Sequence, residues 1–253
     1  MTAQSDLRTS LSSSLKELHL PTIRACFEEI AHIAQKESFA YERYLYELAE
    51  REREDRRHRR IQRLLKQSCL PLEKNIDAFD LKRLPQKLIN QVDLLLEGFF
   101  LEKKENVLAF GNPGSGKTHL LCAVGQSLIY KGYRVYFTPC SLLVQQLLIA
   151  KRELKLSRLL KSLSKFNALL IDDIGYVQHN REEMEVLFTL LADRYERSSI
   201  MLTSNLPFSK WERIFKDPMT TAAAIDRVVH HSVILELNLP SYRVEYAQNN
   251  LKD

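Results

Sequence analysis

Three of the chain's seven glycines stand within six positions, in the stretch FGNPGSGKTHL at residues 110–120. A glycine loses more backbone freedom on folding than any other residue, so such a cluster indicates positive φ angles or a backbone that a ligand approaches closely. The stretch contains the pattern G-x-x-x-x-G-K-[ST], whose backbone N–H groups surround the phosphates of a nucleotide. The residues that fit this pattern are Gly111, Asn112, Pro113, Gly114, Ser115, Gly116, Lys117 and Thr118.

Lys117 and Thr118 are the chemically active side chains of this stretch. In a loop of this kind the lysine neutralises the β- and γ-phosphates, and the hydroxyl is a ligand of Mg²⁺. The stretch stands between a predicted strand and a predicted helix, so the phosphates would also meet the free N–H groups of a helix N-terminus. A glycine turn without a ligand is the alternative, and the strand–loop–helix context favours nucleotide binding.

Two further candidates end the apolar run ALLIDDI at residues 168–174. On a buried parallel strand, charged residues are tolerated at the C-terminal end, where the ligand crevice of an open α/β sheet lies. Asp172 is therefore expected to hold Mg²⁺ through water, and Asp173 to activate the attacking water. The alternative is that the two acids only end a strand and cap a turn, and the upstream phosphate loop makes it less favoured.

Asn205 ends the next apolar run, SIMLTSN, at residues 199–205. Asparagine is a poor strand residue, but a side-chain amide at this edge of a sheet can orient water beside the γ-phosphate. The sequence equally allows Asn205 simply to start the turn before Pro207.

The elements that must position these residues divide the chain into three parts. Residues 1–70 are predicted to form a small helical domain, residues 71–100 a linker with a connecting helix, and residues 101–253 the catalytic domain. The last part alternates helical segments with β-rich runs at 106–110, 134–139, 168–174, 199–205 and 232–238. This alternation predicts an α/β fold with a five-stranded parallel sheet covered by helices on both faces.

The composition is that of a soluble globular protein, with 45% hydrophobic and 27% charged residues. No apolar run reaches the roughly 18 residues of a spanning helix, and the first twenty residues lack the apolar centre of a signal peptide. We therefore expect a cytoplasmic protein with no membrane partner. The four cysteines are far apart and form no C-x-x-C pair, so they indicate neither a zinc site nor a disulfide framework.

The combination of motifs resembles the IstB family, the helper ATPases of insertion-sequence transposition. These are relatives of the DnaC helicase loaders within the AAA+ class. The segments that carry the resemblance are NVLAFGNPGSGKTHL, LLIDDIGY, RYERSSIMLTSNLPFSKWERIF, DPMTTAAAIDRVVHHSVILEL and SYR. The resemblance runs from about residue 38 to Arg243. It implies an AAA+ P-loop fold and a homo-oligomer that uses ATP and Mg²⁺, binds duplex DNA and works with a cognate transposase of the IstA type.

The resemblance also implies roles for individual residues. Lys117 and Thr118 match the Walker A pair of the family, Asp172 and Asp173 the Walker B pair, and Asn205 the first sensor. Arg227 in IDRVVHH resembles the arginine finger that reaches the nucleotide of a neighbouring subunit. Arg243 in SYR stands where a second nucleotide-sensing residue is found.

Two positions depart from the family pattern. The second Walker B acid is Asp173 where most AAA+ proteins have Glu, so its carboxylate lies one methylene further back and slow turnover is expected. The usual GESYR is here LPSYR, so a different turn is expected before Arg243.

Two basic segments are candidates for DNA contact. The segment 51–66 carries seven arginines and one lysine against three acids, and 151–165 is predicted to form one amphipathic basic helix. For each, a solvated helix face is the alternative to a polyanion-binding surface, and the first segment could instead contact transposase. The candidate residues are Arg56, Arg57, Arg59, Arg60, Lys151, Lys155, Arg158 and Lys161.

Two other functions share the phosphate loop. A replicative helicase loader of the DnaC type has the same catalytic motifs and differs in its protein partner. A small-molecule kinase is less favoured, because it explains neither Arg227 beside VVHH nor the basic segment 51–66.

Overall fold

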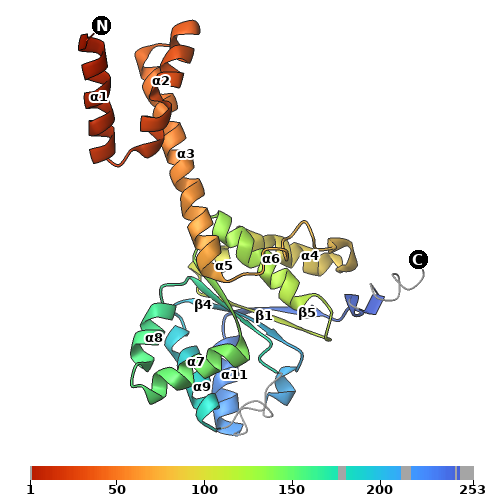
Figure 1. Ribbon diagram of the computed structural model, residues 1–253. Coiled ribbons are helices and arrows are strands. Elements are labelled where there is room, and N and C mark those ends of the chain that lie inside the picture. Colours follow the sequence, from red (N-terminus) through yellow and green to blue (C-terminus); the bar gives the residue numbers. More distant parts are fainter. Residues whose placement is uncertain (1, 176–180, 212–217, 243, 246–253) are drawn as a thin grey trace. The chain divides into compact units, whose positions relative to one another are not determined.

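A computed structural model of the chain describes residues 2–175, 181–211, 218–242 and 244–245 (Figure 1). The chain divides into two compact units, Met1–Arg63 and Leu64–Asp253. The predicted domain limits at residues 70 and 100 stay a prediction. In the described part of the chain, no helix has both the length and the apolar character needed to cross a bilayer.

The first unit is helical, as predicted. It contains α1 (Thr2–Glu17), α2 (Pro21–Lys36) and most of α3 (Tyr41–Ser68). Pro21 opens α2, where a missing N–H and a preset φ angle suit the first turn of a helix. The buried Glu52 of α3 accepts hydrogen bonds from the backbone N–H groups of Thr22 (2.8 Å) and Ile23 (3.1 Å) and so caps α2.

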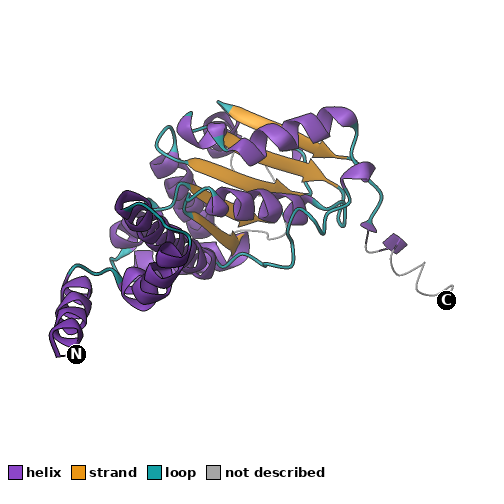
Figure 2. Cartoon of the chain, turned by 90° about the horizontal axis from the view of Figure 1, so that it is seen from above, coloured by secondary structure: helices purple, strands orange, loops and turns teal. Residues whose placement is uncertain are grey.

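The second unit is built on a parallel sheet, whose strands are orange in Figure 2. The sheet has five strands in the order β2-β3-β4-β1-β5. All five predicted strands are confirmed, each within about two residues of its expected limits. The strands are β1 (Asn106–Gly111), β2 (Val135–Pro139), β3 (Ala168–Asp172), β4 (Ser199–Ser204) and β5 (Ser232–Leu237). β4 is buried along its whole length, and β1 and β3 along most of theirs, as expected for parallel strands covered on both faces.

Helices cover both faces of this sheet (Figure 1). One face carries α4 (Gln86–Glu97) and α6 (Lys117–Tyr130), which pack on each other. The other face carries α7 (Cys140–Arg152), α8 (Leu156–Leu163), α9 (Arg181–Arg194) and α11 (Pro218–Val229). Shorter helices are η1 (Leu81–Arg83), α5 (Phe99–Glu102) and η2 (Phe208–Lys210).

The predicted single helix over 151–165 is wrong, because the chain breaks between α7 and α8. Leu154 adopts a left-handed conformation (φ +57°), and the N–H groups of Leu154 and Lys155 donate to the carbonyls of Lys151 and Ala150. This is the bonding pattern of a helix-ending Schellman turn. Glycine usually occupies the left-handed position, so a leucine there left no signal of the break in the sequence.

Residues 71–100, predicted as a linker with a connecting helix, pack on the α6 face. The Gln126 side chain of α6 donates to the carbonyl oxygens of Pro71 (3.1 Å) and Lys74 (3.1 Å), and α4 lies against α6. This segment therefore becomes part of the wall beside the phosphate loop.

Candidate nucleotide-binding site

The phosphate loop follows β1 and uses its three glycines where side chains would clash. All three have positive φ angles: Gly111 (+151°), Gly114 (+80°) and Gly116 (+97°). A Cβ at Gly111 would lie 2.2 Å from the Leu237 carbonyl oxygen, and one at Gly114 would lie 2.1 Å from the Ser241 hydroxyl. The glycines therefore allow other parts of the chain to approach the loop backbone closely, and they also leave the backbone N–H groups of the loop exposed.

The phosphate loop leads directly into the N-terminus of α6. Gly116 precedes the helix and makes no side-chain cap, and the N-terminus of a helix favours an anion. The Lys117 ammonium donates to the carbonyls of Gly111 (2.9 Å) and Asn112 (2.8 Å), which folds it back over the loop. The buried Ser115 hydroxyl has no hydrogen-bond partner among the described residues.

Thr118 and Asp172, the two residues of the predicted magnesium site, lie together. The Thr118 hydroxyl donates to Asp172 Oδ1 at 2.7 Å. The Thr203 hydroxyl, from β4, donates to the same oxygen at 2.6 Å. A hydroxyl and a carboxylate are the oxygen ligands that Mg²⁺ prefers, so the donor set fits this ion.

Thr203 is a site residue that sequence reasoning missed. Its hydroxyl also accepts a hydrogen bond from the Asp173 N–H at 2.8 Å, so one side chain orients both acids. The sequence shows Thr203 as a polar residue within an apolar strand. Its closeness to the two acids depends on the pairing of β3 with β4 in the register Ile171↔Leu202, which the sequence does not reveal.

Asp173 follows the end of β3 in a left-handed conformation (φ +61°), which a short polar side chain tolerates. Burial and the neighbouring Asp172 carboxylate raise the pKa of Asp173, and the Lys117 ammonium opposes them. A raised pKa makes a carboxylate a better proton acceptor near neutral pH.

Asn205 follows β4, which lies between the loop-bearing β1 and the acid-bearing β3. Its Oδ1 is buried and has no hydrogen-bond partner among the described residues. A Cβ at Gly175 would lie 2.5 Å from this oxygen, so the amide packs directly on that glycine. An unpaired polar atom at this point suits a side chain that orients a ligand or a water, and this role of Asn205 stays a prediction.

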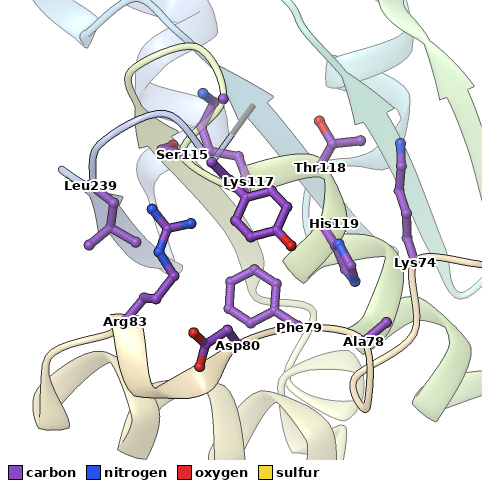
Figure 3. A pocket seen from close by; sticks show the side chains of 13 residues that line it. Lys74, Ala78, Phe79, Asp80, Arg83, Ser115, Lys117, Thr118, His119 and Leu239 are labelled. Atoms are coloured by element: carbon purple, nitrogen blue, oxygen red, sulfur yellow. The ribbon is translucent and has the colours of Figure 1, made fainter. Parts of the chain in front are cut away.

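A cavity of about 210 Å³ opens beside the phosphate loop (Figure 3). One wall comes from the 71–100 segment, through Lys74, Phe79 and Arg83, and sequence reasoning did not assign these residues to the site. The Phe79 ring meets the His119 ring edge-on at 5.3 Å, and the His119 Nε2 lies 2.9 Å from the Asn75 carbonyl oxygen. The cavity thus joins a phosphate-binding loop to an aromatic surface, which is what a nucleoside phosphate requires.

Phe79→Ala is expected to weaken nucleotide binding. Loss of a ring that stacks on a base costs about 1–3 kcal/mol, so the Kd for a fluorescent ADP analogue should rise by roughly 5- to 150-fold. The control is Phe99→Ala, since Phe99 is 57% exposed and does not line this cavity. An unchanged Kd in Phe79→Ala would place the base elsewhere.

Arg227 lies on α11, which packs on α9 on the face opposite α6 (Figure 1). Its guanidinium stands 4.5 Å from the centre of the Phe188 ring. Its Nη1 is buried without a hydrogen-bond partner, and no ion pair joins it to a carboxylate in the described part of the chain. Arg227 therefore has no ion pair with the adjacent Asp226 or with another acid among the described residues, and its role in a neighbouring subunit stays a prediction.

Arg243 lies outside the described residues, and its predicted role stays a prediction. Its neighbour Tyr242 lines the cavity, and the Tyr242 N–H donates to the Gly114 carbonyl at 3.0 Å. Arg83 fastens the same segment through the Pro240 carbonyl (3.1 Å) and the Glu245 carboxylate (2.7 Å).

The basic candidates in 51–66 differ in what they contact. Arg56 donates to Glu52 Oε1 at 2.8 Å and to the His19 carbonyl, and Arg59 pairs with Asp55 at 2.6 Å. Although burial opposes it, hydrogen bonds from Arg56 and from the N–H groups of α2 hold the pKa of Glu52 below its ordinary value. Arg56 and Arg59 therefore help to hold α2 on α3.

Other basic candidates are exposed. Arg57 and Arg158 form no ion pair with any described residue, and neither does Lys161. Lys151 pairs with Glu185 of α9 (2.9 Å), and Lys155 pairs with Glu153 (2.8 Å). Contact with DNA stays a prediction for all eight candidates.

Comparison with protein families and curated proteins gives a consistent result. The family model described as IstB-like ATP binding protein matches residues 13–250. An insertion sequence ATP-binding protein of Sinorhizobium fredii is 44% identical over 92% of this chain and 78% of its own length. The ATP-binding protein of insertion sequence IS5376 from Geobacillus stearothermophilus is 38% identical over 90% of both chains.

Solved structures with a similar fold are AAA+ proteins of DNA replication. AMPPCP-bound DnaA from Aquifex aeolicus matches with a TM-score of 0.57 at 19% identity, over 73% of this chain and 56% of the DnaA chain. The DnaC helicase loader matches with a TM-score of 0.51 at 23% identity, over 65% of this chain and 96% of the DnaC chain. The fold is that of these AAA+ structures, and the extent of the family match shows that the chain belongs to the family of IstB-like ATP-binding proteins.

Proposed function

We propose that the chain is a cytoplasmic ATPase that assembles with copies of itself, binds duplex DNA and assists an insertion-sequence transposase in selecting or remodelling its target. The observation that carries the ATPase is the convergence of Thr118, Asp172 and Asp173 at one edge of the sheet, beside an uncapped helix N-terminus. The link to transposition rests on relatives that are named insertion sequence ATP-binding proteins.

In the proposed reaction, water attacks the γ-phosphorus of ATP, the bond from this phosphorus to the β,γ-bridging oxygen breaks, and ADP and phosphate leave. Lys117 would exchange its two carbonyl partners for β- and γ-phosphate oxygens. Thr118 and Asp172 would hold Mg²⁺, which neutralises charge on the phosphates when bound. Asp173 would accept the proton of the attacking water, and Asn205 would orient that water.

Thr203 supports this arrangement as a positioning residue. Its hydroxyl donates to Asp172 Oδ1 and accepts from the Asp173 N–H, so one side chain contacts both acids. Asp173 is also one methylene shorter than the usual Glu of AAA+ proteins. A left-handed backbone at Asp173 changes the direction of its side chain, and slow turnover remains the expectation.

Duplex DNA binding is the part of the proposal that separates it from a small-molecule kinase, and phosphate release should rise when duplex DNA is added. Removing one basic side chain from a DNA phosphate flattens the dependence of log affinity on log salt by about 0.9. Arg57→Gln with Arg60→Gln should therefore lower the slope by about 1.8 without changing sequence preference. Arg56 and Arg59 are left intact, because their substitution would also loosen α2.

The matched control is the double variant Lys36→Gln with Lys87→Gln, which also removes two positive charges but from positions outside both basic segments. A third variant, Arg158→Gln with Lys161→Gln, tests α8. If only the α8 variant lowers the slope, the 51–66 segment is assigned to transposase contact instead. If the wild-type chain shows no salt-dependent binding and no stimulation by duplex DNA, the DNA part of the proposal is wrong.

A DnaC-type loader would in addition bind a replicative helicase ring. Under the proposed function the chain binds a transposase and does not bind such a ring.

A further inference from the structure

Side chains of two sequence segments, RYERSS and DRVVHH, that have no role at the nucleotide site meet in the structure. Tyr195 and Glu196 follow α9, while His230 and His231 lie between α11 and β5. The Tyr195 hydroxyl is 2.9 Å from His230 Nδ1, and the rings of His230 and His231 have centroids 3.9 Å apart. Segments 35 residues apart in the sequence thus form one side-chain cluster.

The backbone turns these side chains toward one another. Adjacent residues in an extended chain point to opposite sides, but His231 has a left-handed conformation (φ +60°) that breaks this alternation. Glu196 is also left-handed (φ +57°), in the turn where the N–H groups of Arg197 and Ser198 donate to the Arg194 carbonyl. Non-glycine residues rarely adopt this conformation, and here it is found at two of the three potential ligands.

The turn that carries His230 and His231 is fastened to the sheet through Asn106 at the start of β1. The Asn106 N–H donates to the His231 carbonyl at 2.9 Å, and its side-chain amide donates to the Val228 carbonyl at 3.0 Å. Its Oδ1 accepts from the Ile200 N–H at 2.8 Å. Backbone contacts therefore hold the histidine turn in place, and the cluster lies at the amino ends of the strands. The phosphate loop lies at their carboxyl ends, so nucleotide chemistry does not account for the cluster.

Glu196, His230 and His231 each offer one ligand atom, and these three atoms lie within 4.8 Å of one another. All three residues are exposed, so small side-chain rotations can bring the atoms to the 2.0–2.2 Å bonds that zinc makes with nitrogen and oxygen. Two imidazoles and one carboxylate form a donor set that Zn²⁺ accepts and Mg²⁺ does not prefer.

Two lysines, Lys103 and Lys104, line the cavity that also contains the three potential ligands, and their positive charges repel a cation. The Lys104 ammonium donates to the Leu101 carbonyl at 3.3 Å, which holds it to its own segment. Because of these positive charges we expect an affinity below that of a closed, four-ligand zinc site.

We propose that Glu196, His230 and His231 bind one divalent cation of the zinc type. The Tyr195 hydroxyl acts as a positioning group: it accepts from His230 Nδ1–H and thereby leaves Nε2 for the metal. Three protein ligands leave the fourth coordination position of the cation for water. A cation held by these three residues would link the end of α9 to the end of α11, the helix that carries Arg227.

The test is a titration of the full chain, without a histidine tag and without nucleotide, with Zn²⁺ followed by calorimetry and with Co²⁺ followed by visible absorption. We expect one equivalent of Zn²⁺ to bind, a Co²⁺ spectrum of a low-coordinate nitrogen and oxygen site, and a rise in Tm that EDTA reverses. His231→Ala and Glu196→Gln should each weaken binding by at least about tenfold, and Tyr195→Phe by about tenfold.

His32→Ala is the matched control, because His32 is an exposed histidine on α2 outside the cluster, and it should bind like the wild-type chain. Circular dichroism in the absence of metal identifies a variant that fails to fold. If His231→Ala does not fold, Glu196→Gln still tests the site, because the glutamine side chain has the shape of the glutamate side chain. The proposal is overturned if the wild-type chain binds no Zn²⁺, or if folded His231→Ala and Glu196→Gln bind it with unchanged affinity, which would move the metal to the cysteines or the nucleotide site.

Discussion

Asp173→Asn is expected to lower the rate of ATP hydrolysis by about 10²- to 10⁴-fold while ATP binding stays nearly unchanged. The amide has the shape of the carboxylate and keeps the backbone bond to Thr203, but it cannot accept the proton of the attacking water. Lys117, Thr118 and Asp172 remain to bind the nucleotide. Complexes with DNA that form in the presence of ATP should therefore persist longer than those of the wild-type chain.

The pH dependence provides a second measurement on the same residue. A general base acts only when deprotonated, so hydrolysis falls as the pH drops through the pKa of Asp173. Burial and Asp172 raise this pKa, so the loss begins at a higher pH than for an exposed aspartate. Asp93→Asn, an exposed acid on α4, is the control and should leave both the rate and the profile unchanged. If Asp173→Asn hydrolyses ATP at the normal rate, another group activates the water.

Arg227→Ala is expected to lower hydrolysis by about 10³- to 10⁵-fold, provided that its guanidinium stabilises charge on the phosphoryl group in a neighbouring subunit. The structure gives this side chain an aromatic neighbour, Phe188, and no ion pair among the described residues. A buried Nη1 without a partner is costly within one subunit, and a phosphate of the next subunit would satisfy it. Wild-type hydrolysis should then rise more than linearly with protein concentration.

Mixing two inactive variants tests the trans arrangement directly. Arg227→Ala keeps an intact phosphate loop, and Lys117→Ala keeps an intact Arg227. Together they should recover part of the activity, because some interfaces combine a good loop with a good arginine. The control mixture joins Lys117→Ala with Asp173→Asn, which damage the same site and should not complement. If no ratio of the first pair restores hydrolysis while both variants co-assemble on DNA, Arg227 does not act in trans.

The chemistry of the phosphate site was largely determined by local sequence. Gly111, Lys117 and Thr118 belong to one short pattern, because a loop between a strand and a helix N-terminus requires these residue types at fixed spacing. The five strands were also predictable, since a parallel sheet buried on both faces needs apolar runs of limited length. Asp172 could be placed because a charge is tolerated only where such a run ends, and the family likeness was visible in several separate motifs.

Only the tertiary structure decided which residues from distant segments meet. Thr203 joins the two acids because β4 pairs with β3, and Phe79 joins the cavity because the 71–100 segment folds back on α6. The break at Leu154 and the approach of Glu196 to His231 both depend on left-handed backbone at non-glycine residues. Such conformations carry a small local energy penalty that packing and hydrogen bonds elsewhere offset, so no local pattern of residue types reveals them.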